Sequence, residues 1–322
     1  MITSRVSGKI ILFGEHAVVY GQPALAVPVN QVFAEAEVLD SPRAGIWINA
    51  PDIGFHEKLS RIAPENPLAT VVEAVFAELG ISLPPSVLRT SPPEGGEKDG
   101  IEIKVTSTIP IASGLGSGAA VSVAIIRALS SYLGNPLDDE KVNKIAYEAE
   151  KIHHGTPSGI DNTVVTYGKP IFFIKNQPIE LLNVAKAFTI IIADTGISAP
   201  TKQSVADVRK LWEKNPQKIN ALFAAAGSIA RTARQSIEGG HPERLGALMN
   251  ENQRILREIG VSCRELDHLT EASLRSGASG AKLSGGGRGG NMIALSTKEN
   301  APAIAEALLN AGAKNVVVTE IK

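Results

Sequence analysis

The stretch "IPIASGLGSGAAVSVAIIRAL", Ile109 to Leu129, places three glycines and two serines in six positions ahead of an apolar run with helical spacing. Unhindered backbone N–H groups at the start of a helix, backed by the positive end of the helix dipole, form a site for phosphate or another anion. The stretch therefore predicts an anion-binding loop. Dehydrogenases that bind a dinucleotide and kinases that bind ATP both build such loops.

A second glycine-rich stretch, "KLSGGGRGGNMIAL", runs from Lys282 to Leu295 between two predicted strands. A hairpin turn needs only about two glycines. Five glycines indicate that the backbone approaches a ligand closely, with a long hairpin turn as the structural alternative.

Three charged side chains could serve phosphoryl transfer. Lys9 lies among apolar neighbours in "SGKIILFGEH", Glu150 lies on a predicted helix, and Asp161 lies in "PSGIDN". Each has an ordinary structural explanation, as a strand-edge lysine, a solvated helix carboxylate or a turn-forming aspartate. Together they supply a cation for the transferring oxygens, a hard oxygen ligand for Mg²⁺ and a carboxylate near a substrate hydroxyl.

The context of the first loop disfavours a dinucleotide site, although Gly114 to Ala119 matches G-x-G-x-x-A. A dinucleotide loop leaves its strand directly, and a second strand about 20 residues later carries the acid that binds ribose. Here residues 110–113 intervene after the strand, and the acids at that distance, Asp138 and Asp139, begin another predicted helix. A Walker A loop is also excluded, because no Gly-Lys-Ser/Thr follows the glycines.

The elements that must position these residues follow from hydrophobic periodicity and turn signals. In the first half we predict strands over 5–38 with a turn at 21–23, a helix over 67–79, a loop over 82–100, a strand over 101–106, helices over 117–132 and 138–153, and short strands near Val164 and Ile171. In the second half we predict a strand over 188–193, three or four helices up to residue 275, strands over 280–284 and 291–295, a helix over 301–311 and a strand over 315–319. The second set resembles a split β-α-β-β-α-β unit, and a polar stretch at 175–178 suggests domains 1–180 and 181–322.

Composition limits the partners and the compartment. The 322 residues carry a formal net charge of −1 without a basic block, which argues against nucleic acid or a membrane and favours a small-molecule substrate. Cys263 is the only cysteine, as expected in a reducing cytosol. The apolar run 10–13 is too short for a leader, and no run approaches the roughly 18 residues of a membrane span, so we expect a cytoplasmic protein.

Three segments together resemble the GHMP family of small-molecule kinases. The family's Pro-Gly-Lys, apolar run and Gly-Glu-His correspond to "SGKIILFGEHAVVYG" at 7–21, and its ATP loop corresponds to "PIASGLGSGAA" at 110–120. Its later glycine-rich loop corresponds to "GAKLSGGGRGGNMIAL" at 280–295. The resemblance implies an α+β fold, with a ribosomal protein S5 domain 2-like N-terminal ATP-binding domain and a ferredoxin-like C-terminal domain, in a homodimer.

Two sequence segments indicate which substrate accepts the phosphate. Val18 stands where galactokinase-like members place an Asp, and "PSGIDN" resembles the loop of members that phosphorylate mevalonate. The resemblance therefore implies transfer of the γ-phosphate of ATP, with Mg²⁺, to the 5-hydroxyl of mevalonate. The alternatives are phosphomevalonate kinase, a sugar kinase, or a nucleotide-binding relative without catalysis.

The resemblance also implies roles for individual residues. Asp161 would take or orient the proton of the hydroxyl, Lys9 would stabilise the transferring phosphate, and Glu150 would hold Mg²⁺. Glu15 and His16 would line the mevalonate pocket, and Thr195 would support it. The ATP phosphates would be bound by Pro110, Ser113, Gly114, Leu115, Gly116, Ser117, Gly118, Ala119 and Ala120.

The chain departs from the family pattern at several positions. Ser7 replaces a proline, which alters the rigidity of the strand entry. Gly118 replaces a second serine of the ATP loop, so either Ser117 or water would complete the Mg²⁺ site. Arg288 and Asn291 stand where many relatives have Gly and Cys, and Arg288 would either contact phosphate or point to solvent.

Overall fold

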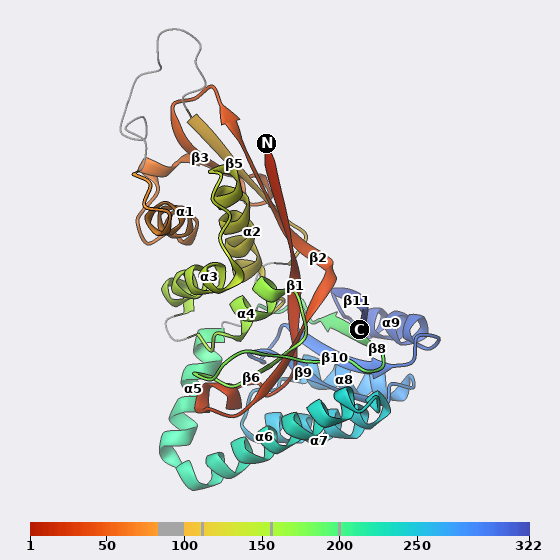
Figure 1. Cartoon of the computed structure of the whole chain (residues 1–322). Helices are drawn as coiled ribbons and strands as arrows, with labels where there is room; N and C mark the ends of the chain where they lie inside the picture. The colour runs from red at the N-terminus through yellow and green to blue at the C-terminus, as the bar shows by residue number, and fades with distance from the viewer. Residues whose placement is uncertain (83–99, 111–112, 155–156, 199–200) are drawn as a thin grey trace. The chain divides into compact units, whose positions relative to one another are not determined.

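The computed structural model describes residues 1–82, 100–110, 113–154, 157–198 and 201–322 (Figure 1). The chain packs into two compact units, each assembled from three segments. Unit 1 comprises Met1–Gly8, Val32–Pro110 and Gly116–Gly168, and unit 2 comprises Lys9–Gln31, Ile111–Leu115 and Lys169–Lys322. The domain bounds 1–180 and 181–322 stay a prediction beside this division by packing.

Two long strands contribute residues to both units, β1 (Ile2–Phe13) and β2 (Ala24–Ser41). In unit 1 the sheet continues through β5 (Gly100–Ser107), β3 (Gly45–Ala50) and β4 (Phe55–Lys58). β2 pairs with β5 in antiparallel register from Ala34 opposite Ser107 to Ser41 opposite Gly100. Buried and more exposed side chains alternate along β2, so one face of this sheet is covered.

Helices of unit 1 pack against this sheet and one another. They are α1 (Pro67–Glu78), α2 (Ser117–Tyr132), α3 (Asp139–His154) and α4 (Ile160–Tyr167). α2 is buried along most of its length and contacts β5 and the other three helices (Figure 1). The Asp138 carboxylate accepts a hydrogen bond of 2.9 Å from the Lys141 N–H, so it caps α3.

The strand predicted near Val164 is wrong, because those residues form α4. The run "TVVT" at 163–166 favours a strand by side-chain type. However, α4 packs against α2 and α3 and is buried almost all round, as a helix enclosed by its neighbours is. Packing thus overrides local propensity.

Unit 2 contains a sheet of four antiparallel strands. These are β8 (Phe188–Asp194), β9 (Gly280–Ser284), β10 (Asn291–Ser296) and β11 (Asn315–Ile321), in the order β11-β8-β10-β9. α8 (Arg264–Arg275) and α9 (Ala301–Asn310) pack on it. This connection and strand order is the ferredoxin-like arrangement, so that prediction is confirmed.

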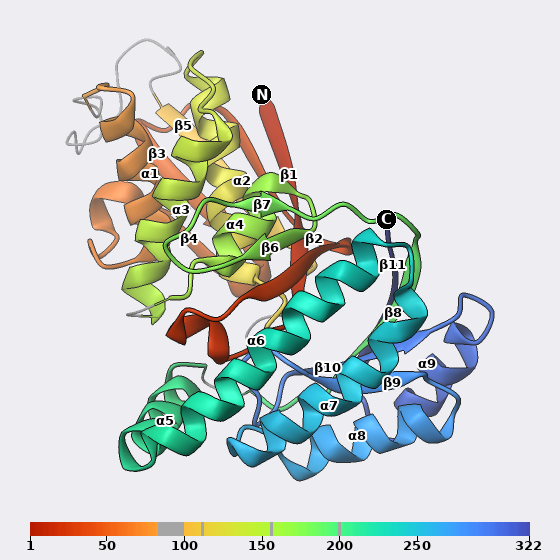
Figure 2. The ribbon, with the colours of Figure 1, turned by 60° about the horizontal axis from the view of Figure 1, so that its bottom comes forward.

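Unit 2 contains further elements, of which η1 belongs to its first segment. They are η1 (Ala17–Tyr20), β6 (Ile171–Phe173), β7 (Glu180–Leu181), α5 (Thr201–Lys214), α6 (Pro216–Glu238) and α7 (Leu245–Glu258). Figure 2 shows α6 and α7 side by side. Tyr20 stacks on Phe223 of α6 with 4.4 Å between ring centroids, so η1 is fixed against α6. Short 3-10 turns complete the structure at Pro51–Ile53, Leu59–Arg61 and Pro242–Arg244.

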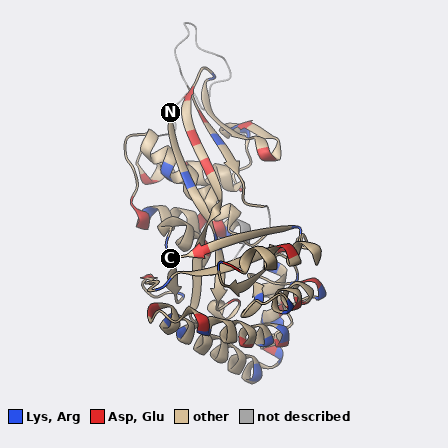
Figure 3. Ribbon diagram, turned by 90° about the vertical axis from the view of Figure 1, so that its right-hand side faces the viewer, with Lys and Arg blue, Asp and Glu red and all other residues tan. Residues whose placement is uncertain are grey.

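Charges of both signs are interspersed along the strands and helices (Figure 3). Among the described residues, no helix combines the length and apolarity needed to cross a bilayer. Most of the loop expected over 82–100, namely 83–99, lies outside the described residues.

Candidate active site

Lys9 brings two of the sequence motifs together in unit 2. Its backbone N–H donates a 3.0 Å hydrogen bond to the Leu115 carbonyl, which joins β1 to the first glycine loop. The residue is only 2% exposed. The apolar flanks of Lys9 in the sequence therefore accompany a buried lysine, and its role in phosphoryl transfer stays a prediction.

The Gly-Glu-His segment makes a tight turn after β1. Gly14 has φ +93°, and a Cβ there would lie 2.4 Å from the Pro23 carbonyl oxygen. His16 also has a positive φ, of 59°, which is uncommon for a residue with a side chain. The turn leaves Glu15 and His16 buried in unit 2.

His16 is held as a neutral ring. Its Nε2 lies 3.0 Å from the carbonyl oxygen of Gly286, so the ring donates its N–H to that carbonyl. Burial lowers the pKa of His16 to about 4, and Arg288 acts in the same direction. At neutral pH His16 is therefore a positioned hydrogen-bonding group without charge.

Glu15 pairs with Lys282, which was not among the predicted site residues. The Lys282 ammonium donates to Glu15 Oε1, and both side chains have no exposed surface. Burial raises the pKa of Glu15 and lowers that of Lys282, while each partner opposes the effect on the other. The apolar flanks of Lys282 in "GAKLS" are the same signal that marked Lys9.

The second glycine loop is shaped by its own chain. Gly287 and Gly289 have positive φ values, and a Cβ on either would lie 2.0 Å and 2.5 Å, respectively, from the carbonyl oxygens of Val261 and Ile197. The Asn291 amide donates to the Ser113 carbonyl. These close backbone contacts are with other segments of unit 2, and the predicted approach of a ligand stays a prediction.

Arg288 has a partner that neither alternative named. Its guanidinium forms a 2.5 Å ion pair with Asp207 on α5, and its Nε donates to the Gly260 carbonyl. Hydrogen bonding from Arg288 lowers the pKa of Asp207 to about 2. In this structure the arginine therefore ties the second glycine loop to α5.

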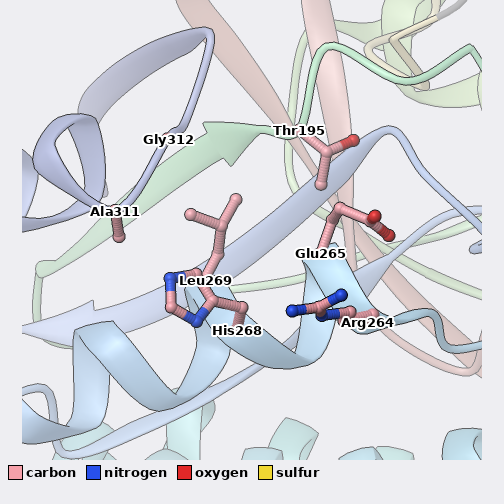
Figure 4. A pocket seen from close by; sticks show the side chains of 7 residues that line it. All are labelled: Thr195, Arg264, Glu265, His268, Leu269, Ala311 and Gly312. Carbon is pink, nitrogen blue, oxygen red and sulfur yellow. The ribbon is translucent and has the colours of Figure 1, made fainter.

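Thr195 lies at the end of β8, where its hydroxyl and backbone N–H each donate a 2.9 Å hydrogen bond to the Gly290 carbonyl. It also lines a pocket of about 300 Å³, together with Arg264, Glu265, His268, Leu269, Ala311 and Gly312 (Figure 4). The other predicted substrate residues, Glu15 and His16, are described but do not line this pocket. The role of Thr195 toward the substrate remains a prediction.

In unit 1 the first glycine loop ends in the N-terminus of α2. Gly116 precedes the helix with φ 76°, and no side chain hydrogen-bonds to cap it among the described residues. Ser117, Gly118 and Ala119 begin the first turn, where backbone N–H groups lack partners within the helix, and the first helical hydrogen bond runs from the Ala120 N–H to the Gly116 carbonyl at 2.9 Å. A Cβ at Gly118 would meet no described atom within 4 Å. These features fit an anion such as a phosphate group.

Two carboxylates of unit 1 lie on helices that contact each other. Glu150 is 7% exposed on α3, and Asp161 lies in the first turn of α4. The described residues contain no group of three or more His, Cys, Asp or Glu side chains arranged for a metal. Mg²⁺ bound with a nucleotide needs only one or two protein carboxylates beside phosphate oxygens, so the oxygen donors of Glu150 and Ser117 fit that ion chemically.

The predicted site residues thus form two sets. Unit 2 brings Lys9, Glu15 and His16 together with Ser113, Gly114, Leu115 and the second glycine loop, and also carries Thr195. Unit 1 carries Pro110, Gly116, Ser117, Gly118, Ala119, Ala120, Glu150 and Asp161.

Comparison with known proteins agrees with this architecture. The family model "GHMP kinases N terminal domain" matches residues 69–169, and "GHMP kinases C terminal" matches residues 233–314. The mevalonate kinase of Pyrococcus furiosus is 37% identical over 99% of this chain and 96% of its own, and that of Thermococcus sibiricus is 35% identical over 98% and 95%.

Among solved structures, the L. major mevalonate kinase in complex with R-mevalonate superposes with a TM-score of 0.81. It is 30% identical, and the match covers 99% of this chain and 95% of that one. Family models in both halves and relatives above 30% identity along nearly the whole length show that the chain belongs to the GHMP kinase family.

Proposed function

We propose that this protein is a mevalonate kinase, which transfers the γ-phosphate of ATP to the 5-hydroxyl of mevalonate and yields 5-phosphomevalonate and ADP. The observation that carries the proposal is the similarity to mevalonate kinases along nearly the whole chain. The buried Lys9, the glycine-rich start of α2 and Asp161 at the start of α4 are groups that this reaction needs.

The reaction is a direct in-line displacement without a covalent enzyme intermediate. The oxygen of the 5-hydroxyl forms a bond to the γ-phosphorus while the bond from that phosphorus to the β,γ-bridging oxygen breaks. Asp161 accepts the proton of the hydroxyl or orients it, and Lys9 stabilises negative charge on the phosphoryl oxygens. The first turn of α2 binds the ATP phosphates through its N–H groups. Mg²⁺ held with ATP would neutralise phosphate charge, and Glu150 and Ser117 would supply oxygen ligands to it.

Replacement of Asp161 tests the chemistry. Asp161→Asn should lower kcat by about 10² or more, the size of a general-base contribution, while the affinity for ATP stays unchanged. Turnover is measured by coupled ADP release, and ATP affinity by calorimetry. Glu140→Gln removes an exposed carboxylate from α3 and serves as the matched control. Near-normal turnover of Asp161→Asn would remove that residue from the role.

The acceptor is tested with the wild-type protein. ADP release is measured with mevalonate, phosphomevalonate, galactose and homoserine, and mevalonate should give the highest kcat/KM. A preference for phosphomevalonate or a sugar would reassign the chain within the family. Nucleotide binding without turnover on any acceptor would instead indicate a regulator.

Two further properties belong to this proposal. The single cysteine, at position 263, supports a reducing compartment such as the cytoplasm. The family resemblance supports a homodimer, which light scattering on the purified protein would test.

A further inference from the structure

Lys282 lies in the middle of β9, a strand whose five residues are all buried. Its ammonium donates to Glu15 Oε1 and, at 2.6 Å, to the carbonyl of Leu283. Glu15 is 267 positions away in the sequence, at the turn that follows β1. The contact therefore fixes the Gly-Glu-His turn to the edge of the four-stranded sheet within unit 2.

Stability alone does not explain such a pair. Removing two charges from water costs about as much as their attraction returns, and well-packed apolar residues often replace a buried ion pair without loss. Removing only one partner is costly, because it leaves a charge buried and unpaired. Lys282 therefore matters through what it does to Glu15.

The two carboxylate oxygens of Glu15 have different environments. Oε1 accepts from Lys282, whereas Oε2 is buried and has no hydrogen-bond partner among the described residues. A buried carboxylate oxygen without a donor is costly, so such an atom calls for a partner from outside the chain. His16, the next residue, already donates to Gly286.

We propose that Lys282 is a positioning residue, which holds Oε1 of Glu15 so that Oε2 accepts a hydrogen bond from a hydroxyl of the bound substrate. This inference rests on the proposed function, because the substrate hydroxyl is one of mevalonate. Without Lys282 the buried Glu15 loses its hydrogen-bond donor and the larger part of its charge compensation, since the charge of Lys9 acts on it more weakly, so the carboxylate no longer keeps one orientation.

The test separates positioning from folding. Lys282→Met should raise both the KM for mevalonate and its Kd, measured by calorimetry without ATP, by about tenfold or more, the value of a hydrogen bond to a charged group. The KM for ATP should change by less than about twofold, since the ATP loop contacts are untouched. Lys298→Met, at an exposed position, is the matched control.

A double-variant cycle gives the sharper result. Glu15→Gln alone should raise the KM for mevalonate, and Glu15→Gln with Lys282→Met should match Glu15→Gln, because Lys282 acts only through Glu15. The double variant also contains no unpaired buried charge, so it keeps the test valid even where Lys282→Met fails to fold.

Three results would overturn the inference. One is a lowered Tm of Lys282→Met with unchanged KM and Kd for mevalonate, which would show that Lys282 has a purely structural role. Another is a double variant whose KM is the product of the single effects, which means that Lys282 acts independently of Glu15. The third is a wild-type protein that neither binds nor phosphorylates mevalonate, and this result alone also removes the proposed function.

Discussion

Gly118 occupies the second position of α2, in open space and at an ordinary helical backbone conformation, where relatives carry a serine. A glycine within a helix is less favourable than alanine by about 1 kcal/mol. Because the space is open and the backbone is helical, neither strain nor crowding requires glycine here. A larger residue at position 118 can therefore be used to test whether a side chain there binds Mg²⁺.

We expect Gly118→Ser to lower the Mg²⁺ concentration needed for half-maximal turnover at fixed ATP, because a second hydroxyl joins Ser117. Gly118→Ala is the matched control, since it gains the helix propensity, about 0.5–1 kcal/mol in urea unfolding, without a hydroxyl. Equal Mg²⁺ dependence of the two variants would show that position 118 supplies no ligand.

The pKa of His16 predicts a specific pH dependence of stability. Its folded pKa of about 4 lies below the model value of 6.5, so the unfolded chain binds the proton more readily. The stability contributed by neutral His16 is fully present above pH 6.5 and is lost as the pH falls toward 4. Between pH 7.5 and 5 the loss amounts to roughly 2 kcal/mol.

Urea unfolding of wild type and His16→Gln at both pH values measures this loss. Glutamine can still donate to the Gly286 carbonyl but does not titrate. The variant should therefore lose about 2 kcal/mol less than wild type on acidification. An identical pH dependence in the two proteins would contradict the burial argument.

At the residue scale, sequence reasoning identified single residues better than pairs. The apolar flanks of Lys9 indicated burial correctly, but the Glu15–Lys282 contact joins positions 267 apart, which no local pattern displays. The sequence also left two roles for Arg288, a phosphate contact or a side chain in solvent. Its actual partner, Asp207, lies on a different element and could not be recognised from the local sequence. The partners of Glu15 and Arg288 are therefore known only from the tertiary structure.

At the element scale, α4 depends on the glycine that precedes it. Gly159 has φ 90° and ψ 0°, and the Thr163 hydroxyl donates to its carbonyl at 2.6 Å. A side chain in left-handed backbone costs about 1–2 kcal/mol. Asp161 follows two residues later in the first turn of α4. The backbone conformation of Gly159 therefore determines the position of the Asp161 carboxylate.

Gly159→Ala should therefore lower stability by about 1–2 kcal/mol and also reduce kcat. Gly168→Ala is the matched control: Gly168 ends the same helix with φ 61° and has open space for a Cβ. The two variants should lose similar stability in urea unfolding, while only Gly159→Ala loses turnover. Equal kcat values would show that the start of α4 does not position Asp161.

Elements with long, consistent periodicity were predictable. The helix over 117–132 and the strands and helix from 280 onward agree with α2, β9, β10, α9 and β11. α4 failed because it is short and rich in β-branched residues, so only its packing between α2 and α3 distinguishes helix from strand. The glycines at 285–290 were recognised as unusual, but their contacts with Val261 and Ile197 require the tertiary structure.

At the scale of the whole molecule, unit 2 is discontinuous in sequence. Its last segment, 169–322, contains the four-stranded sheet, whereas residues 9–31 contribute Glu15 and His16. Without residues 9–31, Lys282 would be left without its carboxylate and Ser284 without the Ile11 carbonyl that accepts its hydroxyl at 2.8 Å.

A fragment of residues 169–322 should consequently lack a cooperative unfolding transition of its own, because removing one partner of a buried pair costs about 3–5 kcal/mol. Urea unfolding followed by tryptophan fluorescence measures this, since Trp212 lies within the fragment. Co-expression with residues 1–31 should restore the transition. A cooperative transition of the fragment alone would show that its sheet is sufficient.

The same discontinuity has a consequence for synthesis on the ribosome. Glu15 leaves the ribosome early, but Lys282 follows 267 residues later, which at about 5–20 residues per second is a delay of roughly 10–50 s. Throughout that time the nascent N-terminal strand carries an apolar run and a carboxylate whose burial partner does not yet exist. Unit 2 can therefore close only after nearly the whole chain has been translated, and a chaperone that binds extended apolar segments has its longest access there.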